Sequence, residues 1–487
     1  MEMNWPLIFQ IAYLLVLILV CFRIIYDTRA NAKSLAYLLF AIFVPFAGMA
    51  FYFTFGVNYR TRRMYSKKLV KNSELSDKLR EKIYQYSKQT FNLSDATVQS
   101  NEELVTLLLK DTLSPLTSNN SVKLMVNGEN KFPDVLKALK NAKDHIHIEY
   151  YIFEDDQIGK EIEKILIEKV KEGLDVRFIY DDYGSRAIRK TMVPRMRTNG
   201  IQAFPFFKVR FITLANRLNY RNHHKIIVID GITAFIGGIN VSDKYINNAK
   251  QPKKLFWRDT HLRIDGPGVQ YLQYLFLCDW NFCAELKLEP NDKFFPPLSS
   301  IPVNGNKIVQ IAASGPDSPS PVILYAILQA INLASEEILI TSPYFIPNDS
   351  LLDALCIAAL GGVKVKILVP MKSDSVFVDY AVRSYYSDLL KAGIEIFQYT
   401  KGFVHAKTMV CDNKIAMIGT ANMDTRSFDL NFEVNAIVYN KQVAKELSAI
   451  FYDDLKDSVI LNETIWSKRS VLKKFMGKAV RLFSPLL

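Results

Sequence analysis

Cysteine is scarce in this chain, with five residues among 487, and the five are scattered. Such a distribution predicts no disulfide framework, and Cys278 and Cys283 have no matching second pair that would complete a zinc site. The sequence also lacks a cluster of carboxylates suited to hold Mg²⁺ or Ca²⁺. We therefore expect reduced, mostly buried thiols, as in a cytosolic catalytic portion, at Cys21, Cys278, Cys283, Cys356 and Cys411.

Charge is missing from two runs near the N-terminus. Residues 5–22 are apolar except for Gln10, and residues 34–59 contain no charged side chain. About 20 helical residues cross a hydrocarbon core of roughly 30 Å, so each run is long enough. A secretory signal peptide is the alternative for the first run, but a basic n-region and a clear cleavage site are missing. We predict a membrane hairpin over 1–64, with transmembrane helices at about 5–25 and 35–58; Pro45, Gly48 and Gly56 leave a kinked or partly re-entrant second helix open.

Positive charge gathers directly after the second run. The connector 27–33 holds Arg29 and Lys33. The larger group consists of Arg60, Arg62, Arg63, Lys67, Lys68 and Lys71. The positive-inside tendency places everything after residue 60 in the cytoplasm. The formal net charge of +12 and the pI near 9.2 indicate an anionic partner, and charge alone does not separate nucleic acid from an anionic membrane surface.

The remainder of the chain predicts a duplicated α/β architecture. Hydrophobic content of 49% argues against disorder, and the length suggests two or three domains. Residues 65–120 are polar and helix-favouring, so we expect a helical connector there. From 121 onward strands and helices alternate, and the same order returns later, which predicts tandem units over 121–295 and 300–466 with a linker near 290–306. His145 and His147 share a strand face, and Ile338 and Ile340 at the equivalent positions favour packing over a metal site.

The last stretch, 467–487, carries six Lys or Arg and no acid. On a helix, one stripe holds Val471, Leu472, Phe475, Met476, Ala479 and Leu482. The opposite side mostly holds Lys473, Lys474, Lys478 and Arg481. This pattern is typical of a basic amphipathic helix on an anionic membrane surface. A basic helix docked on the protein is the alternative.

A repeated motif carries the chemistry. The stretch FVHAKTMVCDNKIAMIGTANMDTRSFDLNFE over 403–433 has an earlier copy, NHHKIIVIDGITAFIGGIN, over 222–240. Both copies read H-x-K-x4-D, with an asparagine 17 residues after the histidine and an acidic strand signal later. The residues are His223, Lys225, Asp230, Asn240 and Asp259 in the first copy, and His405, Lys407, Asp412, Asn422 and Glu433 in the second.

These residue types suit phosphoryl transfer. Residues i and i+2 of a strand point to the same face, so each histidine lies beside its lysine. Two lysines and two asparagines at one centre would hold phosphate oxygens. One imidazole would attack phosphorus while the other protonates the leaving oxygen. Asp259 and Glu433 are candidates to orient the two rings. The lysine pairs would take the place of a metal, so we expect neither metal nor cofactor.

The paired motif resembles the phospholipase D superfamily, and the order of parts resembles more narrowly the bacterial cardiolipin synthases. The resemblance covers nearly the whole chain. It rests on RNHHKIIVID, FWRDTHLRIDGP, TSPYFIP, the second motif and the basic tail ending LFSPLL. One departure is Gly238, where the family more often has serine; Thr420 holds the corresponding place in the second copy. The missing hydroxyl would weaken one phosphate contact.

The resemblance implies an α/β fold of tandem duplicated phospholipase D-like domains, with mixed β-sheets flanked by helices and pseudo-two-fold symmetry, preceded by two transmembrane helices. It implies phosphatidyl transfer between two phosphatidylglycerol molecules, giving cardiolipin and glycerol through a phosphatidyl-histidine. By analogy His223 is the nucleophile and His405 the acid/base, although the sequence is symmetric on this point. Asp230 and Asp412 belong to the catalytic motif, but their role at strand ends can also be structural.

Three alternatives remain open from the residues. A hydrolase of the same superfamily, either a phospholipase D or a nuclease, would pass the intermediate to water, and a non-catalytic scaffold would only bind anionic lipid. Two membrane helices argue against a nuclease, and two intact motifs argue against a scaffold. We therefore expect a multi-pass protein of the bacterial cell membrane whose partners are phosphatidylglycerol and cardiolipin, with no nucleic acid. The oligomeric state and the range of donors and acceptors stay open.

Overall fold

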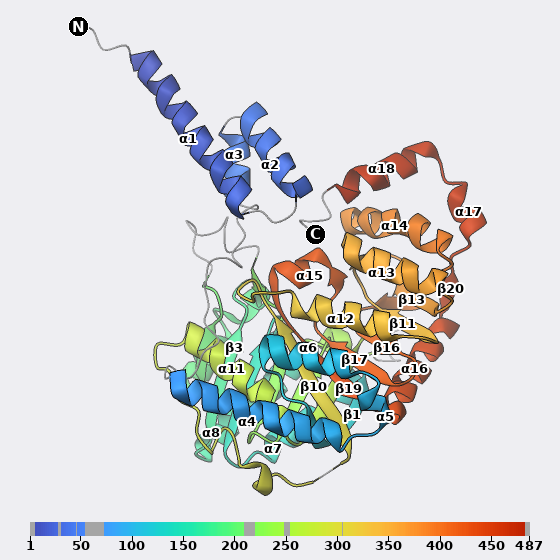
Figure 1. Cartoon of the computed structure of the whole chain (residues 1–487). Coiled ribbons are helices and arrows are strands. Elements are labelled where there is room, and N and C mark those ends of the chain that lie inside the picture. Colours follow the sequence, from blue (N-terminus) through green and yellow to red (C-terminus); the bar gives the residue numbers. More distant parts are fainter. Residues whose placement is uncertain are drawn as a thin grey trace. The chain divides into compact units, whose positions relative to one another are not determined.

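The computed structural model describes residues 5–27, 31–44, 46–53, 73–208, 220–247, 254–303 and 305–482 (Figure 1). The described elements fall into two compact units. The first contains the N-terminal helices α1 to α3, and the second contains the helices and strands from α4 to α18.

The first unit is built around helix α1 (Trp5–Asp27). Its stretch Trp5–Tyr26 is the one helix among the described residues that is long and apolar enough to cross a membrane. Helices α2 (Asn31–Phe43) and α3 (Ala47–Phe51) follow. The hydroxyl of Tyr52 donates a hydrogen bond to the Arg23 carbonyl at 3.2 Å, which ties the residue after α3 to α1. The predicted helix at about 5–25 is therefore confirmed as a helix.

The predicted second helix over about 35–58 is not confirmed as one continuous helix, because the described part is divided into α2 and α3 and residues 54–58 lie outside the described residues. Helix α2 ends at Phe43, two residues before Pro45, which has no N–H to continue a helical ladder. Thirteen residues span only about 20 Å, short of a hydrocarbon core. A Cβ at Gly48 would overlap the carbonyl of Phe40, so α3 packs closely against α2. Arg29 and the predicted cation group at 60–71 lie outside the described residues, as does Gly56.

The second unit begins with helices, as expected for the connector. These are α4 (Ser73–Asn92), α5 (Ala96–Gln99) and α6 (Glu102–Thr112). The carboxylate of Asp95 caps α5 by accepting the N–H groups of Thr97 and Val98. Leu104, Val105 and Leu108 are buried on one face of α6, which packs against the second half of the unit. The first strand starts at Thr117, slightly before the predicted boundary at 121.

A mixed 16-stranded sheet forms the frame of the second unit. The parallel strands of the first half are β2 (His145–Tyr150), β3 (Asp175–Tyr180) and β4 (Gln202–Pro205). Its antiparallel strands are β6 (Lys225–Ile229), β7 (Thr233–Gly237), β9 (Thr260–Asp265) and β1 (Thr117–Val126). The central strands β2 and β6 are buried throughout, as expected for strands rich in Ile and covered on both faces.

The second half repeats this order. Its parallel strands are β11 (Glu337–Thr341), β13 (Lys364–Pro370) and β14 (Glu395–Tyr399), with β20 (Ser458–Ile460) antiparallel at the edge. Its antiparallel strands are β16 (Thr408–Cys411), β17 (Ile415–Gly419), β19 (Asn431–Tyr439) and β10 (Lys307–Ser314). Strands β1 and β10 pair antiparallel and join the halves into one sheet. Five short strands complete the set of described strands: β5 (Arg221–Asn222), β8 (Phe256–Arg258), β12 (Phe345–Ile346), β15 (Gly402–Val404) and β18 (Met423–Asp424).

Helices complete each half. The first half has α7 (Asn127–Lys140), α8 (Gln157–Lys171) and α9 (Met192–Thr198). The second has α12 (Val322–Leu333), α13 (Asp349–Leu360), α14 (Val376–Lys391), α15 (Thr425–Asp429) and α17 (Glu463–Ser467). Figure 1 shows α12, α13 and α14 side by side over the second half. In α8 the buried Ile158, Ile162, Ile165 and Leu166 recur at helical spacing, so one face packs on the sheet.

The two halves share a core and do not form separate compact units. Ile226 and Leu262 of the first half lie in the same buried cluster as Val410 and Val434 of the second. Helices α11 (Val269–Cys283) and α16 (Lys441–Lys456) add their apolar faces to this cluster. The predicted segments 121–295 and 300–466 thus correspond to two halves of one body.

The C-terminal helix α18 (Val471–Arg481) docks on α14 (Figure 1). Gly477 and Val480 are buried in this contact, and Arg481 pairs with Asp388 at 2.8 Å. The apolar stripe containing Val471, Leu472 and Phe475 remains exposed. The face of α18 that contains Gly477 and Val480 is therefore docked on the protein, as the alternative prediction had it. The predicted apolar stripe is exposed to solvent. Residues 483–487 of the LFSPLL ending lie outside the described residues.

The side chains of His145 and His147 are packed inside the first half of the second unit. His147 stacks on Phe276 with ring centroids 4.4 Å apart, and both His145 and His147 contact the Gln273 amide. These contacts agree with the predicted packing role. All five cysteines are free thiols; Cys278 and Cys411 are buried and the other three are half-buried.

We predict that the two halves of the second unit unfold together, because they share the core that contains Leu275. Leu275→Ala should lower the free energy of unfolding by about 2–5 kcal/mol and shift one cooperative transition. Thermal unfolding of the full-length protein in detergent, with hydrogen exchange in β6 and β16, measures this. Leu286→Ala, at an exposed site, is the matched control. Faster exchange in only one half would contradict the prediction.

Candidate active site

Two short strand pairs bring the motif histidines to the opposite half of the unit. Strand β5 runs parallel to β19, and the His223 N–H that follows it donates to the Phe432 carbonyl at 2.9 Å. Strand β15 runs parallel to β8, and the His405 N–H donates to the Arg258 carbonyl at 2.6 Å. Each histidine is therefore attached to the acid-bearing strand of the other half.

The two imidazole–carboxylate pairs cross between the halves in the same way. Nδ1 of His405 lies 2.7 Å from Oδ2 of Asp259, and Nδ1 of His223 lies 2.9 Å from Oε2 of Glu433. Both acids are fully buried, and each histidine keeps 8% of its surface exposed. With Nδ1 held by a carboxylate, Nε2 is the ring nitrogen left for a reacting group. The sequence predicted these partners but not which acid belongs to which ring.

Each motif lysine lies against its own histidine. Nζ of Lys225 donates to the His223 carbonyl at 2.9 Å and lies 5.4 Å from the centre of the Tyr151 ring. Nζ of Lys407 lies 3.1 Å from both ring nitrogens of His405. Burial lowers the pKa of Lys225 to about 7 and that of Lys407 to about 8.

Burial and the two motif lysines also shift the pKa values of the histidines and of their acid partners. Burial and the charge of Lys407 lower the pKa of His405 to about 3. Burial, Lys225 and Lys407 hold the pKa of His223 well below its usual value, so the lysine of each half acts on the histidine of the other. Burial raises the pKa of Glu433 to about 7. Burial also opposes ionisation of Asp259, yet His405 and Lys407 together hold its pKa below the usual range.

The two predicted phosphate-binding asparagines differ in their contacts. The Asn240 amide is engaged at both ends: Nδ2 donates to the Tyr245 hydroxyl at 2.8 Å and Oδ1 accepts the Ile152 N–H at 3.3 Å. Oδ1 of Asn422 is buried and has no hydrogen-bond partner among the described residues. Asn422 is thus the better placed of the two to meet a ligand, and Asn240 braces the segment that carries Tyr151.

Asp230 and Asp412 lie at the far ends of their strands from the histidines. The carboxylate of Asp230 accepts the N–H groups of residues 143–145, and that of Asp412 accepts the N–H groups of residues 335–337. Both residues have positive φ, 53° and 51°. These contacts fasten the strand-end turn to the start of β2 or β11. The structure does not place either acid beside the imidazoles, and the contacts that it shows for both acids are structural.

The departure at Gly238 has a steric reason. A Cβ at this position would overlap Oδ1 of Asp259, the acid that holds His405. At the corresponding place, the Thr420 hydroxyl exchanges hydrogen bonds with the backbone of Val434, next to Glu433. That the missing hydroxyl weakens a phosphate contact stays a prediction; the structure adds that a glycine here leaves room for the carboxylate that holds His405.

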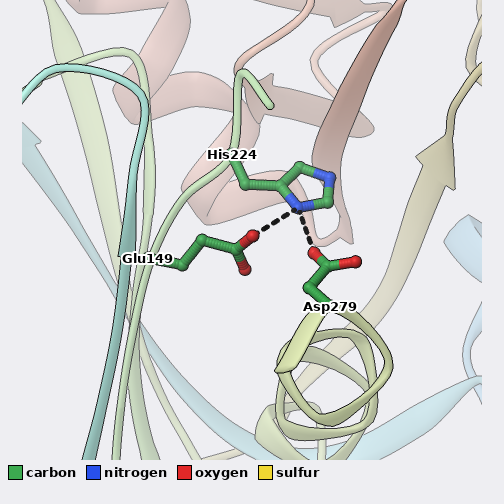
Figure 2. Close-up of side chains that lie close together, drawn as sticks. All are labelled: Glu149, His224 and Asp279. Carbon is green, nitrogen blue, oxygen red and sulfur yellow. Dashed lines mark hydrogen bonds and ion pairs between the residues drawn. The ribbon is translucent and has the colours of Figure 1, made fainter. Parts of the chain in front are cut away.

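Sequence reasoning missed a buried group behind His223. Figure 2 shows the carboxylates of Glu149 and Asp279 both turned toward Nδ1 of His224, at 3.7 and 3.0 Å. Asn222 links this group to the motif, since its Oδ1 accepts the His224 N–H at 3.0 Å and its amide donates to Glu149. The doublet His223-His224 was the available signal.

Donor atoms of this group lie within 4.8 Å of one another, the spacing of metal ligands. A proton on Nδ1 that is donated to Asp279 accounts for the same geometry without a metal. The group supports the strand that carries His223, and we assign it that structural role.

Comparison with known proteins places this site in a family. The family described as "Cardiolipin synthase, PLD-like domain" matches twice, at residues 135–251 and 327–455, so each half contains one copy. The family "Phospholipase_D-nuclease N-terminal" matches residues 11–56. A crystal structure of phosphatidylserine synthase from Haemophilus influenzae Rd KW20 shares the fold, with a TM-score of 0.57 and 14% identity over 81% of this chain and 100% of that one.

Two relatives extend the similarity over nearly the full length. A protein of Listeria monocytogenes serotype 4a named cardiolipin synthase is 39% identical over 484 residues, which covers 98% of this chain and 99% of the relative. Another of that name from Staphylococcus aureus is 40% identical over 472 residues, 96% of this chain and 94% of the relative. The fold and the paired motifs define a protein of the phospholipase D superfamily. Within it, the chain belongs to the cardiolipin synthase family.

We predict that Gly238→Ser lowers phospholipid turnover at least tenfold, because the new side chain displaces the Asp259 carboxylate from His405. Steady-state rates on phospholipid micelles measure the loss, and thermal unfolding monitors folding. Gly238→Ser combined with Asp259→Asn should be no slower than Asp259→Asn alone, since both changes act on one contact. Independent, multiplied losses in the double variant would contradict this explanation.

Proposed function

We propose that this protein is a cardiolipin synthase that transfers a phosphatidyl group between two phosphatidylglycerol molecules, releasing glycerol. The observation that carries the proposal is the pair of crossed imidazole–carboxylate contacts, each with a buried lysine beside it. Membership of the cardiolipin synthase family agrees with it.

The first step breaks a P–O bond and forms a P–N bond. Nε2 of His223 attacks the phosphorus of the donor lipid, and His405 gives a proton to the departing glycerol oxygen. The second step reverses this order: His405 takes a proton from the head-group hydroxyl of the acceptor lipid, which attacks phosphorus and releases His223. The products are cardiolipin and glycerol.

The different surroundings of the two acids favour these roles. Asp259, whose pKa is held low, is ionised and stabilises a cationic His405, as an acid/base needs. Glu433, whose pKa burial raises to about 7, supplies less charge to His223, which suits a neutral nucleophile. In the empty site burial and Lys407 oppose protonation of His405. A bound phosphodiester brings a negative charge against Lys407 and so favours the imidazolium.

The remaining polar groups hold phosphate. Lys225 and Lys407 would neutralise the non-bridging oxygens through both steps, and the Asn422 amide would add a neutral hydrogen bond. Two buried ammonium groups supply the charge that a metal supplies in other phosphoryl-transfer sites, so the proposal needs no cofactor. The equivalent positions of the two motifs form a pseudo-two-fold arrangement around the phosphorus.

Membrane attachment belongs to the same proposal. Helix α1 would span the bacterial cell membrane, and α2 with α3 would form a second, re-entrant or crossing segment. The cations at 60–71 would keep the catalytic unit on the cytoplasmic side, with phosphatidylglycerol and cardiolipin as partners and no nucleic acid.

Product analysis tests the proposal. The full-length protein in detergent–phosphatidylglycerol micelles should give cardiolipin and glycerol in equal amounts, measured by lipid extraction and mass spectrometry. His223→Ala and His405→Ala should each lower turnover at least a thousandfold without changing thermal unfolding. In His405→Ala, a slow first step should leave a phosphatidyl adduct on His223, detected by peptide mass spectrometry. Phosphatidic acid alone would assign the chain to the hydrolases, and an adduct on His405 in the matched His223→Ala variant would exchange the two roles.

The lysine pKa values predict the alkaline limb of the pH profile. Phosphate binding needs the protonated ammonium groups, so kcat/KM should fall as pH rises through about 7 to 8. The fall should not come from unfolding. The unfolded lysines, with the ordinary pKa of 10.5, bind more protons in this window, so stability due to these groups rises with pH. Initial rates and unfolding measured in the same buffers check both signs; an unchanged kcat/KM at pH 9 would contradict the prediction.

A further inference from the structure

A third cation, Lys244, lies near His405 and acts on Lys407. Lys244 is four residues after Asn240, in the short helix Asp243–Tyr245. Its Nζ lies 4.3 Å from the centre of the Trp257 ring and 5.2 Å from that of Tyr245. The same two rings contact His405, with centroid distances of 5.6 and 6.0 Å. Lys244 and the catalytic imidazole of His405 thus contact the same two aromatic rings.

The ammonium group of Lys244 has no hydrogen-bond acceptor or ion partner among the described residues, although the side chain is half-buried. Its charge reaches the catalytic centre, because Lys244 adds to the burial that lowers the pKa of Lys407. Burial lowers the pKa of Lys244, and the charges of Glu154, Asp259 and Asp374 oppose that shift. These carboxylates act on Lys244 through space and none of the described ones pairs with it, while two aromatic rings lie beside its ammonium group, so the cation can receive an anion.

The proposed reaction requires such an anion. The acceptor phosphatidylglycerol carries its own phosphodiester, separated from the attacking hydroxyl by the three carbons of the head-group glycerol. Lys225, Lys407 and Asn422 are occupied by the phosphoryl group being transferred. The second negative charge must therefore be met close to His405, which takes the proton from the attacking hydroxyl.

We propose that Lys244, together with Trp257 and Tyr245, forms the subsite for the phosphodiester of the acceptor lipid. This inference rests on the proposed function. The ring faces would contact the glycerol carbons while the ammonium group binds the phosphate, which holds the hydroxyl at His405 and water away from it.

The chain offers a matched comparison in its other half. Arg426 lies four residues after Asn422, the position equivalent to Lys244. Its charge acts on Tyr151, whose ring lies 4.7 Å from that of His223. Arg426 is thus a cation on the nucleophile side, where the acceptor hydroxyl does not bind.

An acceptor without a phosphate tests the Lys244 subsite separately from the site that holds the transferred phosphoryl group. Labelled glycerol can attack the phosphatidyl-histidine and give labelled phosphatidylglycerol, and this exchange has no use for Lys244. The full-length protein is incubated with phosphatidylglycerol micelles and labelled glycerol, and both lipid products are quantified by mass spectrometry. The ratio of cardiolipin to labelled phosphatidylglycerol is independent of how much of a variant is folded.

Lys244→Gln should lower this ratio at least tenfold, Lys244→Arg should restore it to within about twofold, and Arg426→Gln should leave it unchanged. An unaltered ratio in Lys244→Gln would overturn the subsite, and so would an equal change in Arg426→Gln. Failure of the proposed function looks different, because the unmodified protein would then form neither cardiolipin nor labelled phosphatidylglycerol.

Discussion

The crossed contact between each catalytic imidazole and a carboxylate of the opposite half is the interaction on which the site depends. Asp259 belongs to the first half and holds His405 of the second, while Glu433 does the reverse for His223. Neither half by itself pairs its motif histidine with a carboxylate. The pairing of β1 with β10 and the shared core therefore serve the chemistry as well as stability, since they hold the two halves in the one arrangement that completes both pairs.

Burying these charges opposes folding and prepares the site for an anion. Lys225 and Lys407 are almost fully removed from water, and their pKa values are lowered because the ammonium form loses solvation. A phosphodiester placed between them restores part of the lost interaction. The motif histidines and lysines are buried, and low solvent exposure strengthens the electrostatic contacts among them.

Much of the fold was predictable, because strand and helix periods are local properties and the motif occurs twice. The differences arose where distant groups meet. Asp230 and Asp412 looked catalytic by position in the motif, yet they bind backbone N–H groups of segments far from the histidines. The second apolar run was long enough to span a bilayer, but it breaks before Pro45 and α3 packs back on α2.

The residue types of the site, their spacing and their duplication are contained in the sequence, and they were enough to indicate two-histidine phosphoryl transfer. The sequence does not contain the assignment of each acid to its ring, because His405 and Asp259 are 146 residues apart and His223 and Glu433 are 210 residues apart. The meaning of Gly238 and the place of Lys244 beside His405 likewise depend on contacts between segments. Local periodicity carries no information about such contacts; packing of the two halves decided them.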